Sequence, residues 1–473
     1  MTDRSGVVAA VDLGATSGRV VLGRIGPDRI DIEVVHRFPN RPVRIADGLH
    51  WDILGLYREV LEGLRKAVAA EPDLRSIGID SWAVDYGLFR RDRPIGCPYH
   101  YRDQRTSRGV ELVHGVVDPA ALYAVNGLQF LAFNTLYQLA VDRDDGLLDD
   151  DTRMLLVPDL LAFWLTGEQR TEQTNASTTG LLDVFGGGWN TALLDKLDLP
   201  HTLLPPLVLP GEVIGRLSPE VCVAIGAARP LDVVAVGSHD TASAVVGVPL
   251  ASREAAYISS GTWSLVGMEL DEPVLTGASR IANFTNEGGV DGRIRYLRNA
   301  MGMWVLNECV DAWRREDEEA ELERVLDDAA HASRWVVFDV DHPSLVPAGD
   351  MPSRVERLVA DAGQTGLSRG ELVRSILESL AHSYAVTLDE LEALTGVAVD
   401  TVHLVGGGSQ NPLLCQLVAD HSGRTVAAGP VEATAIGNVV VQARAAGLVS
   451  GDLEAVRLRV AAAFPPRWYE PKA

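Results

Sequence analysis

The chain has 473 residues, of which 47% are hydrophobic and 23% are charged. That composition is typical of a folded globular protein, and the length exceeds what one hydrophobic core usually supports, so we expect two domains. The formal net charge of −23 disfavours nucleic acid and anionic membrane surfaces as partners. The sequence contains neither a run of about 18 apolar residues nor a signal-type segment, so we expect a cytoplasmic protein.

The four cysteines, Cys97, Cys222, Cys309 and Cys415, lie far apart and form no CxxC pair. This spacing favours neither a zinc site nor a disulfide-linked scaffold, and we expect reduced thiols.

Residues 7–24 (VVAAVDLGATSGRVVLGR) place a Gly/Ser/Thr turn between two β-branched apolar runs, which predicts a β-hairpin. A P-loop or a dinucleotide-binding fold needs a helix directly after its glycines, and neither GxxxxGK[ST] nor GxGxxG occurs here. Backbone N–H groups in such a turn can bind an anion, although an ordinary hairpin turn is the alternative. The candidate phosphate contacts are Gly14, Ala15, Thr16, Ser17 and Gly18, with Arg19 adding positive charge.

Asp12 ends the first strand of this hairpin. Hard cations prefer carboxylate and water ligands, so Asp12 is a candidate for binding Mg²⁺ directly or through water. A turn-forming aspartate is the alternative.

Helical periodicity over 51–70 is followed by the strand-like segment 77–80. The next residues, in IGIDSWAVDYG and YRDQRT, offer charged groups beside an aromatic face, a combination that can hold a polyol. The alternatives are a core tryptophan and a surface Arg/Asp pair. The candidates are Asp80, Trp82 and Asp85, which we expect in a loop, and Arg102, Asp103 and Arg105.

The segment 233–247 (VVAVGSHDTASAVVG) delivers His239 and Asp240 to the start of a predicted helix. A sugar hydroxyl loses its proton as it attacks a γ-phosphoryl group, and a positioned carboxylate can accept that proton. The alternatives are that Ser238 or Asp240 only caps the helix and that His239 is a buried, hydrogen-bonded histidine.

Residues 255–267 (AAYISSGTWSLVG) repeat the plan of the first hairpin, so Ser260, Gly261 and Thr262 become a second candidate phosphate turn. Two copies predict two related domains, with a break near 247–254 and boundaries of 1–248 and 249–473. Two such turns could clamp a polyphosphate between the domains.

The acidic segment 311–330 is interpreted as a solvated helix face. Helices are predicted over 370–395 and 412–422, and a strand over 402–407, which makes the class α/β with mixed sheets. Gly406, Gly407 and Gly408 end that strand, and their side-chain-free backbone would let a flat ring approach closely.

Taken together, the motifs resemble the FGGY carbohydrate kinases, and among them the bacterial L-rhamnulokinases. The likeness covers nearly the whole chain. It is carried by AVDLGATSGRV, IGIDSWAVDYG, YRDQRT, QFLAFNTLYQL, VPDLLAFWLTG, TNASTTGL, SHDTASAV, AYISSGTWSLVG, NFTNEGG, LRNAMGMWVLNE, VGGGSQN and GPVEATAIGN.

The resemblance implies two ribonuclease-H-like domains of the actin/hexokinase type, with a nucleotide and sugar cleft between an N-terminal sugar-binding and catalytic domain and a C-terminal nucleotide-binding domain. It implies ATP and Mg²⁺ as co-substrates and phosphorylation of a ketose at O1. Asp240 matches the catalytic base. The matched nucleotide contacts are Ala15, Thr16, Ser17, Gly18, Arg19, Thr262, Asn307, Gly406, Gly407 and Gly408, and the matched sugar contacts are Ala83, His239, Asp240, Thr241 and Asn299.

Two positions depart from the resembled pattern. Ala83 replaces a glycine that contacts the sugar, and Asn307 replaces an expected glutamine on the nucleotide side.

From the resemblance as a whole we predict an L-rhamnulose kinase that forms L-rhamnulose 1-phosphate, as a monomer or homodimer. The alternatives are a kinase for another ketose such as L-fuculose or L-xylulose and an actin-like ATPase switch.

Overall fold

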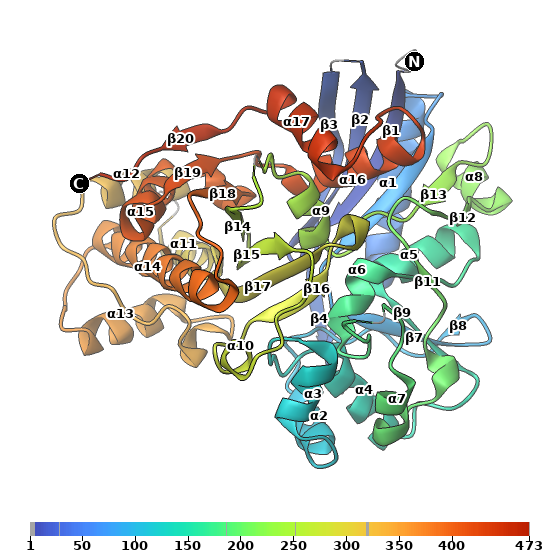
Figure 1. Ribbon diagram of the computed structural model, residues 1–473, viewed down its shortest axis with the longest axis horizontal. Coiled ribbons are helices and arrows are strands. Elements are labelled where there is room, and N and C mark those ends of the chain that lie inside the picture. Colours follow the sequence, from blue (N-terminus) through green and yellow to red (C-terminus); the bar gives the residue numbers. More distant parts are fainter. Residues whose placement is uncertain (1–4, 28, 186, 251, 318–320, 473) are drawn as a thin grey trace. The chain divides into compact units, whose positions relative to one another are not determined.

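The computed structural model describes residues 5–27, 29–185, 187–250, 252–317 and 321–472 (Figure 1). The chain divides into two compact units, each of mixed α/β structure. Unit 1 comprises Met1–Ala251, Glu269–Tyr296 and Ala433–Ala463, and unit 2 comprises Ser252–Met268, Leu297–Glu432 and Phe464–Ala473. The sugar and nucleotide roles of the predicted domains 1–248 and 249–473 stay a prediction.

Unit 1 is built on a six-stranded sheet of order β12-β13-β6-β1-β2-β3. β1 pairs antiparallel with β2, which confirms the predicted hairpin, while β1, β6 and β13 run parallel. β1 is buried along six of its eight residues, as expected for a strand covered on both faces. The strands are β1 (Gly6–Leu13), β2 (Ser17–Gly26), β3 (Arg29–Pro39), β6 (Ser76–Ser81), β12 (Val213–Arg216) and β13 (Asp232–Val234).

Unit 2 repeats this arrangement. Within its sheet the strands follow the order β17-β15-β14-β18-β19-β20, with β14 and β15 antiparallel and β14, β18 and β19 parallel. A hairpin beside two parallel strands therefore occurs twice, which confirms the predicted relation between the two halves. The strands are β14 (Ala255–Ser260), β15 (Trp263–Leu270), β17 (Ile294–Met301), β18 (Thr401–Val405), β19 (Thr425–Ala428) and β20 (Arg467–Tyr469).

Helices and three small sheets complete unit 1. The helices are α1 (Ile53–Ala70), α2 (Thr106–His114), α3 (Pro119–Asn126), α4 (Thr135–Asp144), α5 (Val157–Thr166), α6 (Gln173–Ala176), α7 (Thr191–Leu197), α8 (Pro219–Ile225), α9 (Asp240–Val246), α10 (Gly277–Ile281), α16 (Ala433–Ala445) and α17 (Leu453–Ala463). The small sheets pair β4 (Pro42–Ile45) with β5 (Gly48–Trp51), β10 (Thr171–Glu172) with β11 (Leu207–Val208), and β7 (Tyr86–Arg90) with β8 (Arg93–Pro94) and β9 (Thr152–Leu156).

α9, α16 and β1 pack closely together although α16 lies late in the sequence (Figure 1). Glycine is required at Gly437 because a Cβ there would lie 1.8 Å from the carbonyl oxygen of Ser243. Gln442 then donates to the carbonyl of Ala9 at 3.0 Å and accepts from the hydroxyl of Ser76 at 2.7 Å. These contacts fix α16 against α9 and against the central strands β1 and β6.

The predicted helices are confirmed with small shifts. α1 begins at Ile53, two residues late, because Trp51 ends β5 and Asp52 caps the helix by accepting from Gly55 N. The helices of unit 2 are α11 (Trp304–Glu316), α12 (Leu322–Ala330), α13 (Met351–Asp361), α14 (Arg369–Thr395) and α15 (Pro412–Ser422). The acidic segment 311–330 contributes to two helices, and residues 318–320 of it lie outside the described residues.

No helix in the described part of the chain is long and apolar enough to cross a membrane. All four cysteines are free, as predicted; Cys97 is exposed and the other three are buried.

Candidate active site

The turn between β1 and β2 presents backbone amides to solvent. Gly14 N closes the turn by donating to the carbonyl of Ser17 at 2.8 Å. Thr16 is exposed and Ala15 is half-buried, and within the described chain their own N–H groups donate no hydrogen bond. Two free amides in one tight turn can bind an anion, and the phosphate contact predicted for this turn stays a prediction.

Three carboxylates lie near the carboxyl ends of the unit 1 strands. Asp12 and Asp80 are register partners on the parallel strands β1 and β6, and Asp240 begins α9. Burial, with the charge of Asp12 next, raises the pKa of Asp80 well above its usual range, although Asn438 donates to it at 2.5 Å. Arg19 balances Asp12 with two hydrogen bonds of 2.8 and 2.5 Å to Oδ2.

Asp80 was expected in a loop and instead lies within β6 with no solvent exposure. It cannot contact a polyol from the surface, because its Oδ2 faces Asn438 and its Oδ1 is buried without a hydrogen-bond partner among the described residues.

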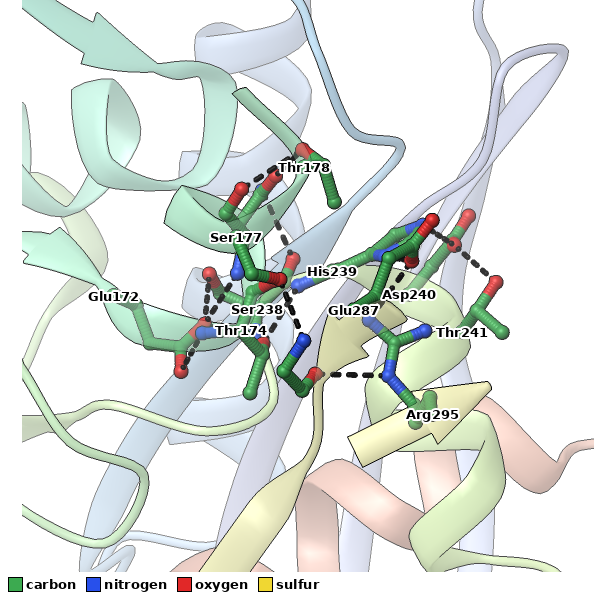
Figure 2. A network of polar contacts seen from close by, with 12 residues as sticks. Glu172, Thr174, Ser177, Thr178, Ser238, His239, Asp240, Thr241, Glu287 and Arg295 are labelled. Atoms are coloured by element: carbon green, nitrogen blue, oxygen red, sulfur yellow. Dashed lines mark hydrogen bonds and ion pairs between the residues drawn. The ribbon is translucent and has the colours of Figure 1, made fainter. Parts of the chain in front are cut away.

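The turn before α9 is anchored by Glu172, which is fully buried (Figure 2). Its carboxylate accepts from Ser238 N at 3.0 Å and Ser238 Oγ at 2.8 Å, and also from Thr174 N and Oγ1 and Asn175 N. The Ser238 hydroxyl is thus not the helix cap. The residue at the cap position is His239, whose side chain makes no capping hydrogen bond.

His239 is held between two carboxylates and one guanidinium (Figure 2). Its Nε2 lies 3.5 Å from Asp240 Oδ1, and its Nδ1 lies 3.2 Å from Glu287 Oε2. Glu287 lies on β16 (Thr285–Gly288), and the fully buried Arg295 on β17 places Nη2 3.1 Å from both Nδ1 and Glu287 Oε2. Although burial alone would raise it, the pKa of Glu287 is lowered by the charge of Arg295 and by His239.

Two contacts of Nδ1 bear on the histidine tautomer. Arginine can only donate, so the hydrogen bond between Arg295 Nη2 and Nδ1 favours the imidazole proton on Nε2, facing Asp240. The 3.2 Å contact between Nδ1 and Glu287 Oε2 favours the other tautomer, with the proton on Nδ1.

Asp240 retains one free oxygen. Oδ1 accepts from Thr241 Oγ1 at 3.1 Å and faces His239, while Oδ2 has no partner among the residues described. Burial raises the pKa of Asp240, His239 opposes this, and the charge of Asp12 adds to it. The side chain is still 30% exposed, so Oδ2 can accept a proton from a bound hydroxyl.

The other predicted sugar residues of unit 1 are less accessible. Trp82 belongs to the unit 1 core, and half-buried Ala83 packs against that core. Arg102 is half-buried and donates to the hydroxyl of Tyr101 at 3.2 Å. Asp103 is structural, because it accepts from Leu49 N and Arg105 N.

The predicted nucleotide residues of unit 2 gather at the β14–β15 turn. The carbonyl of Gly261 accepts from Met303 N at 2.9 Å, which joins the Gly261–Thr262 turn to the start of α11, where exposed Asn307 lies. Gly408 lies against β14 so closely that a Cβ would be 2.2 Å from Ser260 Oγ. Gly406–Gly408 were predicted to end a strand, but β18 ends at Val405 and Gly406 starts the turn that follows. Asn299, a predicted sugar contact, lies half-buried on β17.

A divalent cation would find few protein ligands. No group of three or more His, Cys, Asp or Glu side chains in the described ranges is arranged to hold a metal. Mg²⁺ usually keeps several waters and binds one or two carboxylates plus substrate phosphates. The carboxylates of Asp12, Asp80 and Asp240, near the β1–β2 turn with its free amides, fit that pattern.

Sequence reasoning missed the residues that position the turn before α9. Glu172 lies two residues before the quoted segment TNASTTGL, Glu287 lies inside the quoted segment NFTNEGG, and Arg295 lies within β17. The available signal was the presence of charged residues inside otherwise apolar or small-residue segments. Their partners lie more than 50 residues away in sequence, so the pairing itself was not visible.

Two family models match the chain. The N-terminal domain model of the FGGY family of carbohydrate kinases covers residues 7–247, and the C-terminal domain model covers 256–446. The chain is 39% identical to a rhamnulokinase of Bacteroides thetaiotaomicron over 467 residues, covering 98% of this chain and 95% of that protein. It is 41% identical to a rhamnulokinase of Klebsiella pneumoniae over 440 residues, covering 92% and 88%.

Solved structures agree on the fold. A gluconate kinase from Lactobacillus acidophilus superposes with a TM-score of 0.80 at 17% identity, covering 99% of this chain and 94% of that one. A glycerol kinase from Plasmodium falciparum with ADP gives 0.77 at 15% identity with the same coverage. At these identities the likeness shows the fold alone, while the family models and curated relatives establish the membership. The chain belongs to the FGGY family of carbohydrate kinases and is a sugar kinase.

Proposed function

We propose that this kinase transfers the γ-phosphoryl group of ATP to O1 of L-rhamnulose, giving L-rhamnulose 1-phosphate and ADP. The observation that carries the reaction is the free Oδ2 of Asp240 at the start of α9. The choice of sugar is supported by relatives named rhamnulokinase at 39% and 41% identity.

Asp240 is proposed as the general base. The proton of the sugar O1 hydroxyl moves to Oδ2 as the O1–Pγ bond forms and the bond from Pγ to the bridging oxygen of ADP breaks. We assign the imidazole proton of His239 to Nε2, which lies 3.5 Å from Asp240 Oδ1, and propose that His239 orients the carboxylate so that Oδ2 can accept the proton. The transition state is loose, so the orientation of the carboxylate matters more than its strength as a base.

The remaining roles follow the sequence predictions and stay proposals. Sugar contacts are assigned to Trp82, Ala83, Arg102, His239, Thr241 and Asn299. Phosphate contacts are assigned to Ala15, Thr16, Ser17, Gly18, Arg19, Gly261 and Thr262, and adenosine-side contacts to Asn307, Gly406, Gly407 and Gly408. The free amides of the first turn and the close packing around Ser260 support these assignments.

Mg²⁺ would be held by Asp12, with Asp80 and Asp240 close by, and would neutralise charge on the transferred phosphoryl group. Arg19 fixes Asp12 Oδ2 in the same region.

We also propose a cytoplasmic location, because the reaction consumes ATP and the four cysteines are free. Monomer or homodimer remains the predicted assembly.

The test is a coupled ADP-release assay with L-rhamnulose, L-fuculose, L-xylulose, L-ribulose and glycerol, each with ATP and Mg²⁺. We expect the highest kcat/KM for L-rhamnulose and little ADP release without sugar. A higher kcat/KM for another ketose would replace the proposed substrate. Sugar-independent ATP hydrolysis without a phosphorylated product would instead favour the ATPase switch.

A further inference from the structure

The segment after β6 contains a strained turn at Val84. Asp85 N donates to the carbonyl of Ala83 at 2.9 Å, which closes a γ-turn around Val84, and the φ angle of Val84 is 67°. Every other non-glycine residue with positive φ in the described ranges is Asp, Asn or Arg. A β-branched residue in this region is a true outlier, and its backbone is strained.

Asp85 holds this turn from one side. Its carboxylate is fully buried and accepts from Trp51 Nε1 at 2.6 Å, Trp82 Nε1 at 3.1 Å and Tyr101 N at 3.1 Å, all at Oδ2, and from Gln138 Nε2 at 3.0 Å at Oδ1. Four donors converge on one carboxylate. The indole of Trp82, the residue directly before Ala83, is thereby fixed.

α4 holds the turn from the other side. Thr135 Oγ1 donates to the carbonyl of Val84 at 2.7 Å, and Gln138 Nε2 approaches the same carbonyl at 3.4 Å. Gln138 cannot exchange its amide ends freely, because its Nε2 also donates to the carbonyl of Phe133 at 3.0 Å and its Oε1 accepts from Arg105. The strained conformation is therefore determined by several independent contacts.

Strain that is held this firmly points to a functional conformation rather than to a tolerated defect. Ala83 has no positive φ, so its methyl group adds no backbone strain, and the whole distortion falls on Val84. The distortion sets the direction in which Trp82 and Ala83 are presented, and both are proposed sugar contacts.

We propose that Asp85 is a positioning residue for sugar binding, acting through the Trp82 indole and the Val84 turn to place Trp82 and Ala83 against the ketose. This inference rests on the proposed function. Asp85 acts on binding of the sugar and leaves the nucleotide and the phosphoryl-transfer step unaffected.

Asp85→Asn tests the proposal because asparagine keeps the shape of the side chain but replaces one of its two acceptor oxygens by a donor amide. Both carboxylate oxygens of Asp85 face only donors, so the amide nitrogen of Asp85→Asn meets a donor in either orientation. Gln138 is prevented from turning to offer its oxygen. Thr135→Val is a milder variant that removes only the hydrogen bond to the Val84 carbonyl.

Tyr86→Phe is the matched control. Tyr86 is the next residue in the chain, is also buried, and donates to Asp142 at 2.5 Å, so the control loses one buried hydrogen bond in which Ala83, Val84 and Asp85 take no part. Steady-state kinetics of the full-length enzyme give KM for the ketose, KM for ATP and kcat, and circular dichroism melting reports folding.

We expect Asp85→Asn to raise KM for L-rhamnulose about tenfold, and Thr135→Val about threefold, with kcat within about threefold and KM for ATP within about twofold of wild type. Tyr86→Phe should lower Tm but leave all three constants near wild type. If Asp85→Asn does not fold, Thr135→Val decides. A ketose KM that matches the control, or an equal rise in KM for ATP, overturns the inference. A wild-type enzyme that phosphorylates no ketose overturns the proposed function first and this inference with it.

Discussion

Replacing Arg295 by Met tests how the site fixes His239. Arg295 has no solvent exposure, and it pairs with Glu287 at 3.1 Å while donating to His239 Nδ1 at 3.1 Å. Removing one partner of a buried ion pair costs about 3–5 kcal/mol because the remaining charge is left buried. For a unit of this size we expect Tm to fall by about 4–8 °C. The loss of the fixed tautomer should lower kcat roughly tenfold or more.

The double variant Arg295→Met/Glu287→Met separates stability from catalysis. It removes both charges, so melting by circular dichroism should show that at least half of the lost stability returns. The kcat in the coupled assay should stay low, because neither group is present to hold the His239 ring. Recovery of kcat together with Tm would refute the tautomer argument and reduce Arg295 to a structural residue.

Three further outcomes follow from the site. Glu172→Gln places an amide nitrogen among the five groups that donate to the Glu172 carboxylate. Tm should therefore fall by the equivalent of about 1–3 kcal/mol, and kcat should drop. An unchanged Tm would show that the hydrogen bonds between Glu172 and Ser238 do not stabilise the turn before α9. Ala83→Gly removes a methyl contact worth up to about 0.8 kcal/mol, so KM for L-rhamnulose should rise a few-fold and KM for L-ribulose much less; equal changes for both ketoses would place the methyl away from C6. Burial raises the pKa of Asp85 from 3.8 to about 6, against the lowering effect of its hydrogen bonds, so wild type should lose stability as pH rises through about 6. In full this loss amounts to about 3 kcal/mol, most of it between pH 4 and pH 7, and Asp85→Asn should lack it; the same pH dependence of Tm in both proteins would contradict the shifted pKa.

The fold was predictable where local chemistry decides it. β-branched runs flanking the turns at 12–19 and 259–264 specify the two hairpins, and the periodicity of 412–422 matches α15 residue for residue. The break in the acidic segment after α11 was not predictable, because no proline or glycine interrupts its helical pattern.

The site was predictable only in part. The sequence identifies Asp240 because a carboxylate follows a strand at the start of a helix. It does not reveal that the helix cap is His239, or that Glu172, Glu287 and Arg295 hold the turn, because those contacts depend on tertiary packing across distant segments. Asp85 was a candidate polyol ligand expected in a loop, and its full burial, with hydrogen bonds from two indoles, reverses that interpretation.

The central claim is that Asp240 accepts the proton from the sugar hydroxyl. Asp240→Asn keeps the side-chain shape and cannot depend on capping for its fold, since the cap position is His239. The decisive measurement is kcat for L-rhamnulose by ADP release, with the product identified by ³¹P NMR. We predict L-rhamnulose 1-phosphate from wild type and a kcat reduced about a hundredfold or more in the variant, with sugar and ATP still binding. A variant that retains more than about a tenth of the wild-type kcat would contradict the assignment of Asp240 as the general base.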